Sequence, residues 1–220
     1  MFRGMTLSAA LAALAVCFVS SSRLHAQVIA TAPEAEVPQN AQRWDFYGGA
    51  QYSHFNPGTA RKIQAINLLG WNGSATIWVG SVVGLEGSAR GLYGTLVVPT
   101  NNENIPANPP MSEHLFLFGP NFRLMRHQHY TVGVHTLLGA AYGSFGNGFP
   151  KGTQPEDVSI FDDKLTLGLG IGSWADYNLG RQLAVRVVTE WQPTHYASFW
   201  QNEFAGSVGI VYKFGARNVK

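Results

Sequence analysis

The feature that most constrains the fold of this chain is a period-two alternation of apolar residues with small or polar ones, repeated between Arg43 and Phe214. From Leu165 to Ile171, every second residue is leucine or isoleucine, and the residues between them are threonine and glycine. Such alternation is typical of strands whose two faces meet different surroundings. Glycine in place of polar side chains on the second face indicates a crowded interior. The pattern therefore predicts a closed antiparallel barrel.

Eight segments can each cover the about 9 to 11 tilted residues with which a strand crosses a bilayer. They are 44–55, 69–79, 82–93, 113–125, 130–142, 164–177, 182–192 and 203–214. Short connections (80–81, 126–129 and 178–181) alternate with long ones (56–68, 94–112, 143–163 and 193–202). Outer-membrane barrels have short periplasmic turns and long external loops. The alternation predicts an all-β, eight-stranded, up-and-down transmembrane β-barrel with both termini in the periplasm.

Most prolines in the barrel region lie in the long connections, where they remove no hydrogen bond from a strand ladder. Pro120 is different, because it falls inside the fourth strand segment. Proline has no N–H to donate to a neighbouring strand. The fourth segment is therefore predicted to contain a bulge or a locally missing hydrogen bond.

The first 26 residues have the features of a secretory signal peptide. Arg3 supplies a positive start, 7–19 an apolar core too short for a spanning helix, and Ala26 a small residue at the cleavage site. We predict cleavage after Ala26, Sec-type export, a flexible periplasmic tail over 27–42, the barrel over 43–214 and a short periplasmic extension over 215–220. Cys17, the only cysteine, lies in the signal segment, so the mature chain is predicted to have no disulfide and no cysteine nucleophile.

Charge argues against nucleic-acid binding. The chain has 15 Lys and Arg residues against 13 Asp and Glu residues, and two of the arginines, Arg3 and Arg23, belong to the signal segment. The mature protein is thus close to neutral and lacks the basic stripe that nucleic-acid binding requires.

The last strand segment carries the most specific motif of the chain. Ser207 is followed two residues later by Gly209, and aromatic residues then alternate to Tyr212 and Phe214. The motif resembles the C-terminal assembly signal of small eight-stranded outer-membrane proteins with an OmpA-type transmembrane domain, such as OmpA and OmpX. Further matching segments are 45–49, 70–72, 116–120 and 135–140. The resemblance implies location in the bacterial outer membrane, insertion by the barrel assembly machinery, contact with membrane lipids and lipopolysaccharide, and a monomer.

Strand faces place a set of charged residues in the lumen, where buried charges must pair. Glu86 and Arg90 lie on the third segment, and Arg186 and Glu190 lie on the seventh with complementary spacing. We predict two pairs across the lumen, Glu86 with Arg186 and Arg90 with Glu190, joined near the periplasmic end by Arg123 and Asp176. The resemblance implies a structural or surface role with at most a small gated conductance, which fits a plugged lumen.

An enzymatic alternative is a lipid A hydrolase, because some eight-stranded barrels are lipid A deacylases. Such an enzyme needs a nucleophile, a base and an orienting acid in hydrogen-bond reach. Ser198, His195, Glu190 and Glu203 supply these residue types around the fourth long connection. No deacylase-like His-x-Ser strand motif is present, so we predict no catalytic residues and no enzymatic activity.

Two shorter motifs predict no cofactor and no metal. The glycines of 168–172 resemble a nucleotide-binding loop, but no helix follows them, and they fit one lumen-facing row. His127 and His129 lack a carboxylate or a third ligand nearby, which is typical of a solvated turn.

Two further alternatives remain open from the sequence. The long connections, which contain Asn101, Asn102, Asn104 and Asn147, could make the protein a surface adhesin or ligand-binding barrel. A periplasmic lipocalin-like barrel would also be secreted and eight-stranded, but it would be water-soluble and would bury its large residues inward.

Overall fold

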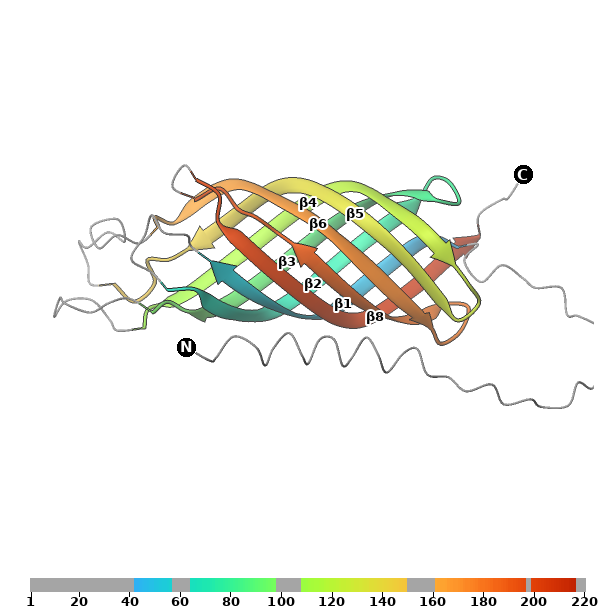
Figure 1. Ribbon diagram of the computed structural model, residues 1–220, viewed down its shortest axis with the longest axis horizontal. Coiled ribbons are helices and arrows are strands. Elements are labelled where there is room, and N and C mark those ends of the chain that lie inside the picture. Colours follow the sequence, from blue (N-terminus) through green and yellow to red (C-terminus); the bar gives the residue numbers. More distant parts are fainter. Residues whose placement is uncertain (1–41, 57–63, 98–107, 150–160, 197–198, 217–220) are drawn as a thin grey trace, which may run out of the picture. The chain divides into compact units, whose positions relative to one another are not determined.

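The structure is a computed structural model that describes residues 42–56, 64–97, 108–149, 161–196 and 199–216. Eight antiparallel strands close into one barrel, in which each strand pairs with its neighbours in the chain and the last pairs with the first (Figure 1). The strands are β1 (Gln42–Asn56), β2 (Ile66–Trp78), β3 (Val83–Thr95), β4 (Pro110–Arg126), β5 (Tyr130–Ser144), β6 (Lys164–Asn178), β7 (Leu183–Trp191) and β8 (Asn202–Ala216). The predicted fold class is confirmed. The predicted signal segment and nearly all of the tail lie outside the described residues.

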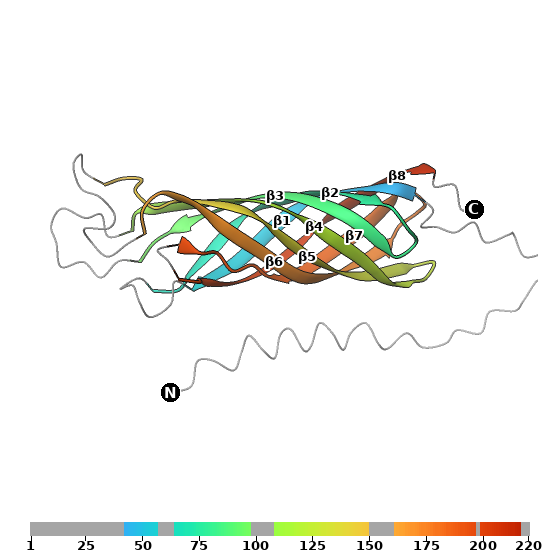
Figure 2. The same cartoon turned by 90° about the horizontal axis from the view of Figure 1, so that it is seen from above.

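The three short connections lie at one end of the barrel, together with the start of β1 and the end of β8 (Figure 1). Each is a tight turn closed by backbone hydrogen bonds, such as Leu179 N to Leu183 O at 2.9 Å and His127 N to Tyr130 O at 2.8 Å. The strand ends that border the long connections lie at the opposite end, and both views show strands that tilt steeply against the barrel axis (Figures 1 and 2). We call the end with the short connections the turn end and the opposite end the loop end.

The fourth long connection differs from its prediction. Instead of leaving the barrel at Pro193, the chain continues along β6: Leu169 N donates to Pro193 O at 3.0 Å, and His195 N donates to Leu167 O at 3.0 Å. Thr194 then bridges both Gly168 and Gln201. These bonds use backbone groups of β6 that lie beyond the end of β7, so much of the predicted loop is an extension of the sheet.

Pro120 interrupts the ladder in the predicted way. The β4–β5 register runs to Phe118 opposite Leu138 and resumes unchanged with Asn121 opposite His135, so the ladder between these described residues skips Gly119 and Pro120. The missing N–H of proline accounts for the gap. The register itself shifts nearer the turn end, between Arg123 and Met125.

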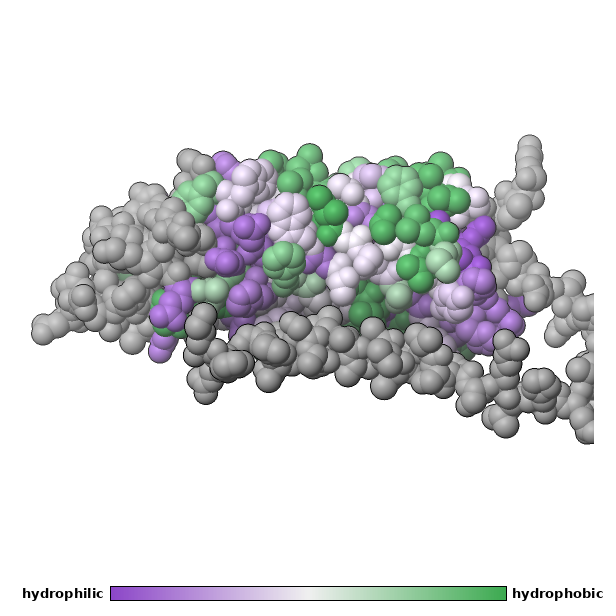
Figure 3. All heavy atoms as spheres, in the orientation of Figure 1, coloured by the Kyte–Doolittle hydropathy of each residue, from purple (hydrophilic) through white to green (hydrophobic). Residues whose placement is uncertain are grey.

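The outward face of the barrel is apolar. Figure 3 shows one side, on which hydrophobic residues gather between hydrophilic residues near the two ends. Most exposed aromatic residues of the strands lie toward their ends, with Phe118 in the middle of β4 as an exception: Tyr52, Trp71, Tyr93, Phe116, Tyr142 and Trp191 toward the loop end, and Phe46, Tyr130, Tyr177 and Tyr212 toward the turn end. Within the described residues, no helix is long and apolar enough to cross a membrane.

The seam between β1 and β8 closes the barrel along the full length of both strands. Their register runs from Gln42 opposite Ala216 to Asn56 opposite Asn202. On the outside of the seam the rings of Phe46 and Phe214 stack with centroids 5.3 Å apart. Each described strand therefore has partners on both sides, and the sheet presents no free edge.

Glycines on the inward face allow large side chains to fit inside. A Cβ atom at Gly133 in β5 would overlap the Trp174 ring and the Phe122 carbonyl oxygen, whereas a Cβ atom at Gly48 in β1 would meet nothing within 4 Å. We expect Gly133→Ala to lower the free energy of unfolding by about 1 to 3 kcal/mol through overpacking. Gly48→Ala is the matched control and should have a much smaller effect. Urea unfolding in detergent, followed by tryptophan fluorescence, measures both, and equal effects would contradict the assignment of faces.

Candidate functional site

The candidate site is the lumen, which holds a large set of buried polar and charged side chains. All the charged residues assigned to the lumen from the sequence are buried there: Glu86, Arg90, Arg123, Asp176, Arg186 and Glu190, together with Asp45, His135 and Lys213. Alternation along the strands accounts for this, because every second residue of a strand in a closed barrel points inward. The charges form two clusters.

The basal cluster, near the turn end, consists of Asp45, Arg123, Asp176, Arg186 and Lys213. Arg186 binds Asp176 through two nitrogens, Nε to Oδ1 at 2.6 Å and Nη2 to Oδ2 at 3.0 Å. Lys213 Nζ lies 2.9 Å from the same carboxylate. Asp45 Oδ2 accepts Arg123 Nη2 at 3.2 Å and lies 3.5 Å from Arg186 Nη2. Each of these buried charges therefore has a partner of opposite sign.

Two tryptophans cover the basal cluster. The Arg123 guanidinium carbon lies 3.5 Å from the Trp78 ring centroid, and that of Arg186 lies 4.3 Å from the Trp174 ring centroid. The two indole rings are 6.3 Å apart. Cations over aromatic faces are attracted by the ring quadrupole, more strongly when desolvated. The arginines are thus held by the rings as well as by carboxylates.

The middle cluster consists of Glu86, Arg90, His135 and Glu190. Arg90 Nη1 lies 2.7 Å from Glu190 Oε1, so the Arg90–Glu190 pair is present. His135 lies between two carboxylates, with Nδ1 3.2 Å from Glu86 Oε2 and Nε2 3.4 Å from Glu190 Oε2. The doubly protonated imidazolium is the form that offers a donor to both carboxylates.

The predicted pair between Glu86 and Arg186 is wrong. Glu86 instead accepts a hydrogen bond from Asn121 and faces His135, whereas Arg186 binds Asp176. Asp176 lies directly opposite Arg186 in the β6–β7 register, which makes it the nearer anion. The tilt of the strands thus favours a neighbour in the sheet over the residue across the lumen.

Two further buried acids lie toward the loop end, Glu113 of β4 and Glu203 of β8. Both residues are fully buried, and their carboxyl groups hydrogen bond to each other. Glu113 Oε1 accepts the Tyr196 hydroxyl at 3.0 Å. Glu203 Oε1 accepts Gln192 Nε2 at 2.6 Å and also the Ser53 hydroxyl. Glu113 and Glu203 are called the carboxyl pair below.

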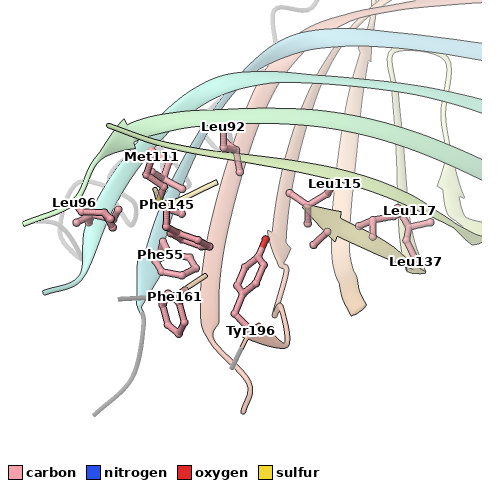
Figure 4. Close-up of a cluster of buried hydrophobic side chains, with 13 residues drawn as sticks. Phe55, Leu92, Leu96, Met111, Leu115, Leu117, Leu137, Phe145, Phe161 and Tyr196 are labelled. Carbon is pink, nitrogen blue, oxygen red and sulfur yellow. The ribbon is translucent and has the colours of Figure 1, made fainter. Parts of the chain in front are cut away.

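The loop end of the lumen is filled by an apolar cap (Figure 4). The cap comprises Phe55, Ile66, Leu68, Leu92, Leu96, Met111, Leu115, Leu117, Leu137, Ala141, Phe145, Phe161 and Tyr196. Phe145, Phe161 and Tyr196 belong to the long connections, and the Phe145 ring lies 5.2 Å from each of the other two. Asp163 fixes this arrangement by accepting the backbone N–H groups of Phe145 and Gly146 at 2.5 and 2.8 Å.

The residues considered for a hydrolase do not form one site. Glu190 is bound by Arg90, and Glu203 is bound by Gln192 and Ser53, both inside the lumen. The His195 ring packs edge-on against Trp200, with ring centroids 4.9 Å apart. Ser198 lies outside the described residues.

The other short motifs take structural positions. Gly168, Gly170 and Gly172 lie in β6, where Gly168 and Gly170 face Leu117 inside the barrel. His127 packs on Tyr130 in a turn, with ring centroids 4.4 Å apart. No group of three or more potential metal ligands occurs in the part of the chain that the structure describes.

The proposed assembly-signal residues divide between the two faces of β8. Ser207 faces inward and accepts the Tyr47 hydroxyl at 2.9 Å, and Gly209 allows close approach to Gly48 and Gly49 of β1. Tyr212 and Phe214 point outward beside the seam and stack with centroids 5.8 Å apart. These residues therefore also contribute to closure of the barrel.

Sequence reasoning missed the carboxyl pair as a lumen feature. Glu113 shares the alternating row of Leu115 and Leu117, and Glu203 shares that of Ser207, so the alternation contains the signal for both. Tyr196 lies beyond the last regular residue of β7. No periodic pattern places a residue of a connection in the lumen.

A closed eight-stranded antiparallel barrel with an apolar outside and a charged lumen defines the class: the fold is that of small outer-membrane β-barrel proteins. No known protein-family model matches the sequence, and neither does any curated protein.

Solved structures with the same fold include OprG from Pseudomonas aeruginosa, with a TM-score of 0.54 and 12% identity over 81% of this chain and 99% of that chain. Ail, the attachment invasion locus protein of Yersinia pestis, has a TM-score of 0.51 and 16% identity over 79% of this chain and 99% of that one. Neisserial surface protein A has a TM-score of 0.50 and 13% identity over 77% and 97% of the two chains. At this level of identity, the likeness shows the fold.

Proposed function

We propose that the protein is an integral outer-membrane barrel with a structural or surface role, and that its lumen is plugged and passes at most a small gated current. The observation that carries the proposal is the filling of the lumen. The basal cluster, the two tryptophans, the middle cluster and the apolar cap follow one another inside the strands, and their side chains are buried. The interior of an eight-stranded barrel is only just wide enough for such side chains.

Membrane insertion is supported by the outward face. Leu138, Val187 and Val208 are each 50% or more exposed, and such side chains are costly to hydrate on a free soluble barrel. Their place between two sets of exposed aromatic residues matches the girdled apolar band of outer-membrane barrels. We further propose Sec-type export, insertion by the barrel assembly machinery, a monomer in contact with membrane lipids and lipopolysaccharide, and no catalytic activity.

Planar-bilayer recording tests the plugged lumen. With the refolded mature protein, we expect rare, small openings, because paired charges and aromatic side chains fill the lumen of the described strands. Large, continuously open currents would contradict the proposal. Heat-modifiable migration on a gel checks, before recording, that the barrel is folded, and failure to extract the protein without detergent separates a membrane barrel from a soluble one.

A further inference from the structure

The carboxyl pair must hold a proton. Glu113 and Glu203 are fully buried, and a hydrogen bond between two carboxyl groups requires one of them to be protonated. The Oε2 atom of each has no other hydrogen-bond partner. Glu203 already accepts hydrogen bonds from Gln192 and Ser53, which favours the ionised form of Glu203. The protonated group is then Glu113, which donates to Glu203.

The charge balance of the lumen supports this assignment. The buried, described residues include six acids (Asp45, Glu86, Glu113, Asp176, Glu190, Glu203), four bases (Arg90, Arg123, Arg186, Lys213) and His135. With His135 as an imidazolium and one proton on the carboxyl pair, five negative charges face five positive ones. A buried excess charge is costly, so the neutral state is favoured.

Few other groups act on the pair. Arg90 of β3 is the cation that acts on Glu203, but its Nη1 is committed to Glu190 and Gln192. The Tyr196 hydroxyl is the other titratable group that contacts the pair. Burial and the neighbouring Glu113 raise the pKa of Tyr196 well above its usual value, so its hydroxyl remains a donor. Loss of the shared proton would therefore leave two buried carboxylates without a new cation to pair with among the described residues.

Tyr196 connects the carboxyl pair to the apolar cap. Its hydroxyl donates to Glu113, and its ring lies 5.2 Å from Phe145 and 5.9 Å from Phe161. Gln201 holds the backbone on both sides of the ring, with Tyr196 N to Gln201 Oε1 at 2.6 Å and Gln201 Nε2 to Tyr196 O at 2.9 Å. Displacement of Tyr196 would therefore also disturb the aromatic contacts that fill the mouth.

We propose that the carboxyl pair is a proton-binding site that latches the loop end of the lumen. While Glu113 and Glu203 share one proton, Tyr196 remains inserted and the apolar cap is packed. When alkaline conditions remove that proton, two carboxylates repel each other in the dry interior, water enters to solvate them, and Tyr196 leaves its position. The mouth then opens without any change in the basal cluster.

Thiol labelling of the refolded mature protein in detergent tests the latch without requiring conductance. Cys17 is the only cysteine and precedes the predicted mature start, so Phe199→Cys introduces one reporter beside the apolar cap. Its maleimide labelling rate is divided by that of Asn202→Cys, an exposed position, to cancel the pH dependence of thiol ionisation. Between about pH 6 and about pH 10 we expect this ratio to increase about tenfold.

The variant Glu113→Gln tests whether loss of the shared proton causes the increase in the labelling ratio. The amide resembles the protonated acid in shape and can donate to Glu203 at every pH, so the ratio should remain low over the whole range. Asp162→Asn, a carboxyl group at the same end but outside the pair, is the matched control and should keep the increase. A ratio that does not change in the parent, or that increases equally in Glu113→Gln, would overturn the proposal. The labelling ratio is measured in detergent and needs no current. A negative labelling result therefore contradicts the latch alone, whereas large open currents in a planar bilayer contradict the plugged lumen.

Discussion

Replacement of Arg186 by leucine is expected to lower the free energy of unfolding by about 3 to 5 kcal/mol, the cost of breaking a buried ion pair by removing one member. Arg186 binds Asp176 through two nitrogens and also lies 3.5 Å from Asp45. Its loss removes the two-nitrogen partner of Asp176 and the cation over the Trp174 ring, and leaves Lys213 as the remaining partner of Asp176. Urea unfolding in detergent micelles, followed by gel mobility and tryptophan fluorescence, measures the difference.

Arg181→Leu is the matched control for this prediction. Arg181 lies five residues away on the turn after β6 and is exposed, so its loss should cost little. Adding Asp176→Asn to Arg186→Leu should restore part of the stability, because the lumen without Arg186 has one excess negative charge and the second substitution removes one. Arg186→Leu and Arg181→Leu with equal stability would show that the basal cluster does not stabilise the barrel.

Replacement of Trp174 by alanine should be about as damaging, at about 3 to 5 kcal/mol, because a cavity replaces a large buried ring. The Trp174 ring packs beside Trp78, and its Nε1 donates to Asn121 Oδ1 at 2.9 Å, so the variant also breaks the layer between the two charge clusters. We expect larger and more frequent openings in planar bilayers as water enters this layer. Both measurements are made on the same refolded sample.

Trp71→Ala is the control for the tryptophan layer. Trp71 points outward and is 44% exposed, so its removal leaves the lumen filled. The conductance of Trp71→Ala should match that of the parent protein, and Trp71→Ala should lose less stability than Trp174→Ala. Openings that increase equally in both variants would assign the current to a general loosening of the barrel.

The fold was accessible from sequence because each strand carries its own period-two signal. Arg90 and Glu190 were predicted to meet, and they do, since alternation alone places both inward near the same level. The partner of Arg186 was not predictable in this way. Strand tilt and register decide which inward residues meet, and the sequence pattern carries neither.

Contacts between distant parts of the chain also limited what could be predicted for the carboxyl pair and Tyr196. Glu113 and Glu203 were within reach of the alternation argument, but their contact depends on β4 and β8 meeting across the lumen. The place of Tyr196 depends on the extension of the chain along β6 after Pro193 and on the Gln201 bonds. These are tertiary contacts, and they override the expectation that residues after a strand form an external loop.

The seam between β1 and β8 has a consequence for the order of events during folding. Gln42 must meet Ala216, so the second edge of β1 remains uncovered until β8 is available. Until then a growing sheet would expose two open edges, which favour aggregation, and closure over so long a separation in sequence is slow. The barrel therefore cannot close before β8 has been made. The unfolded chain must be kept apart from its own copies until β8 has been synthesised.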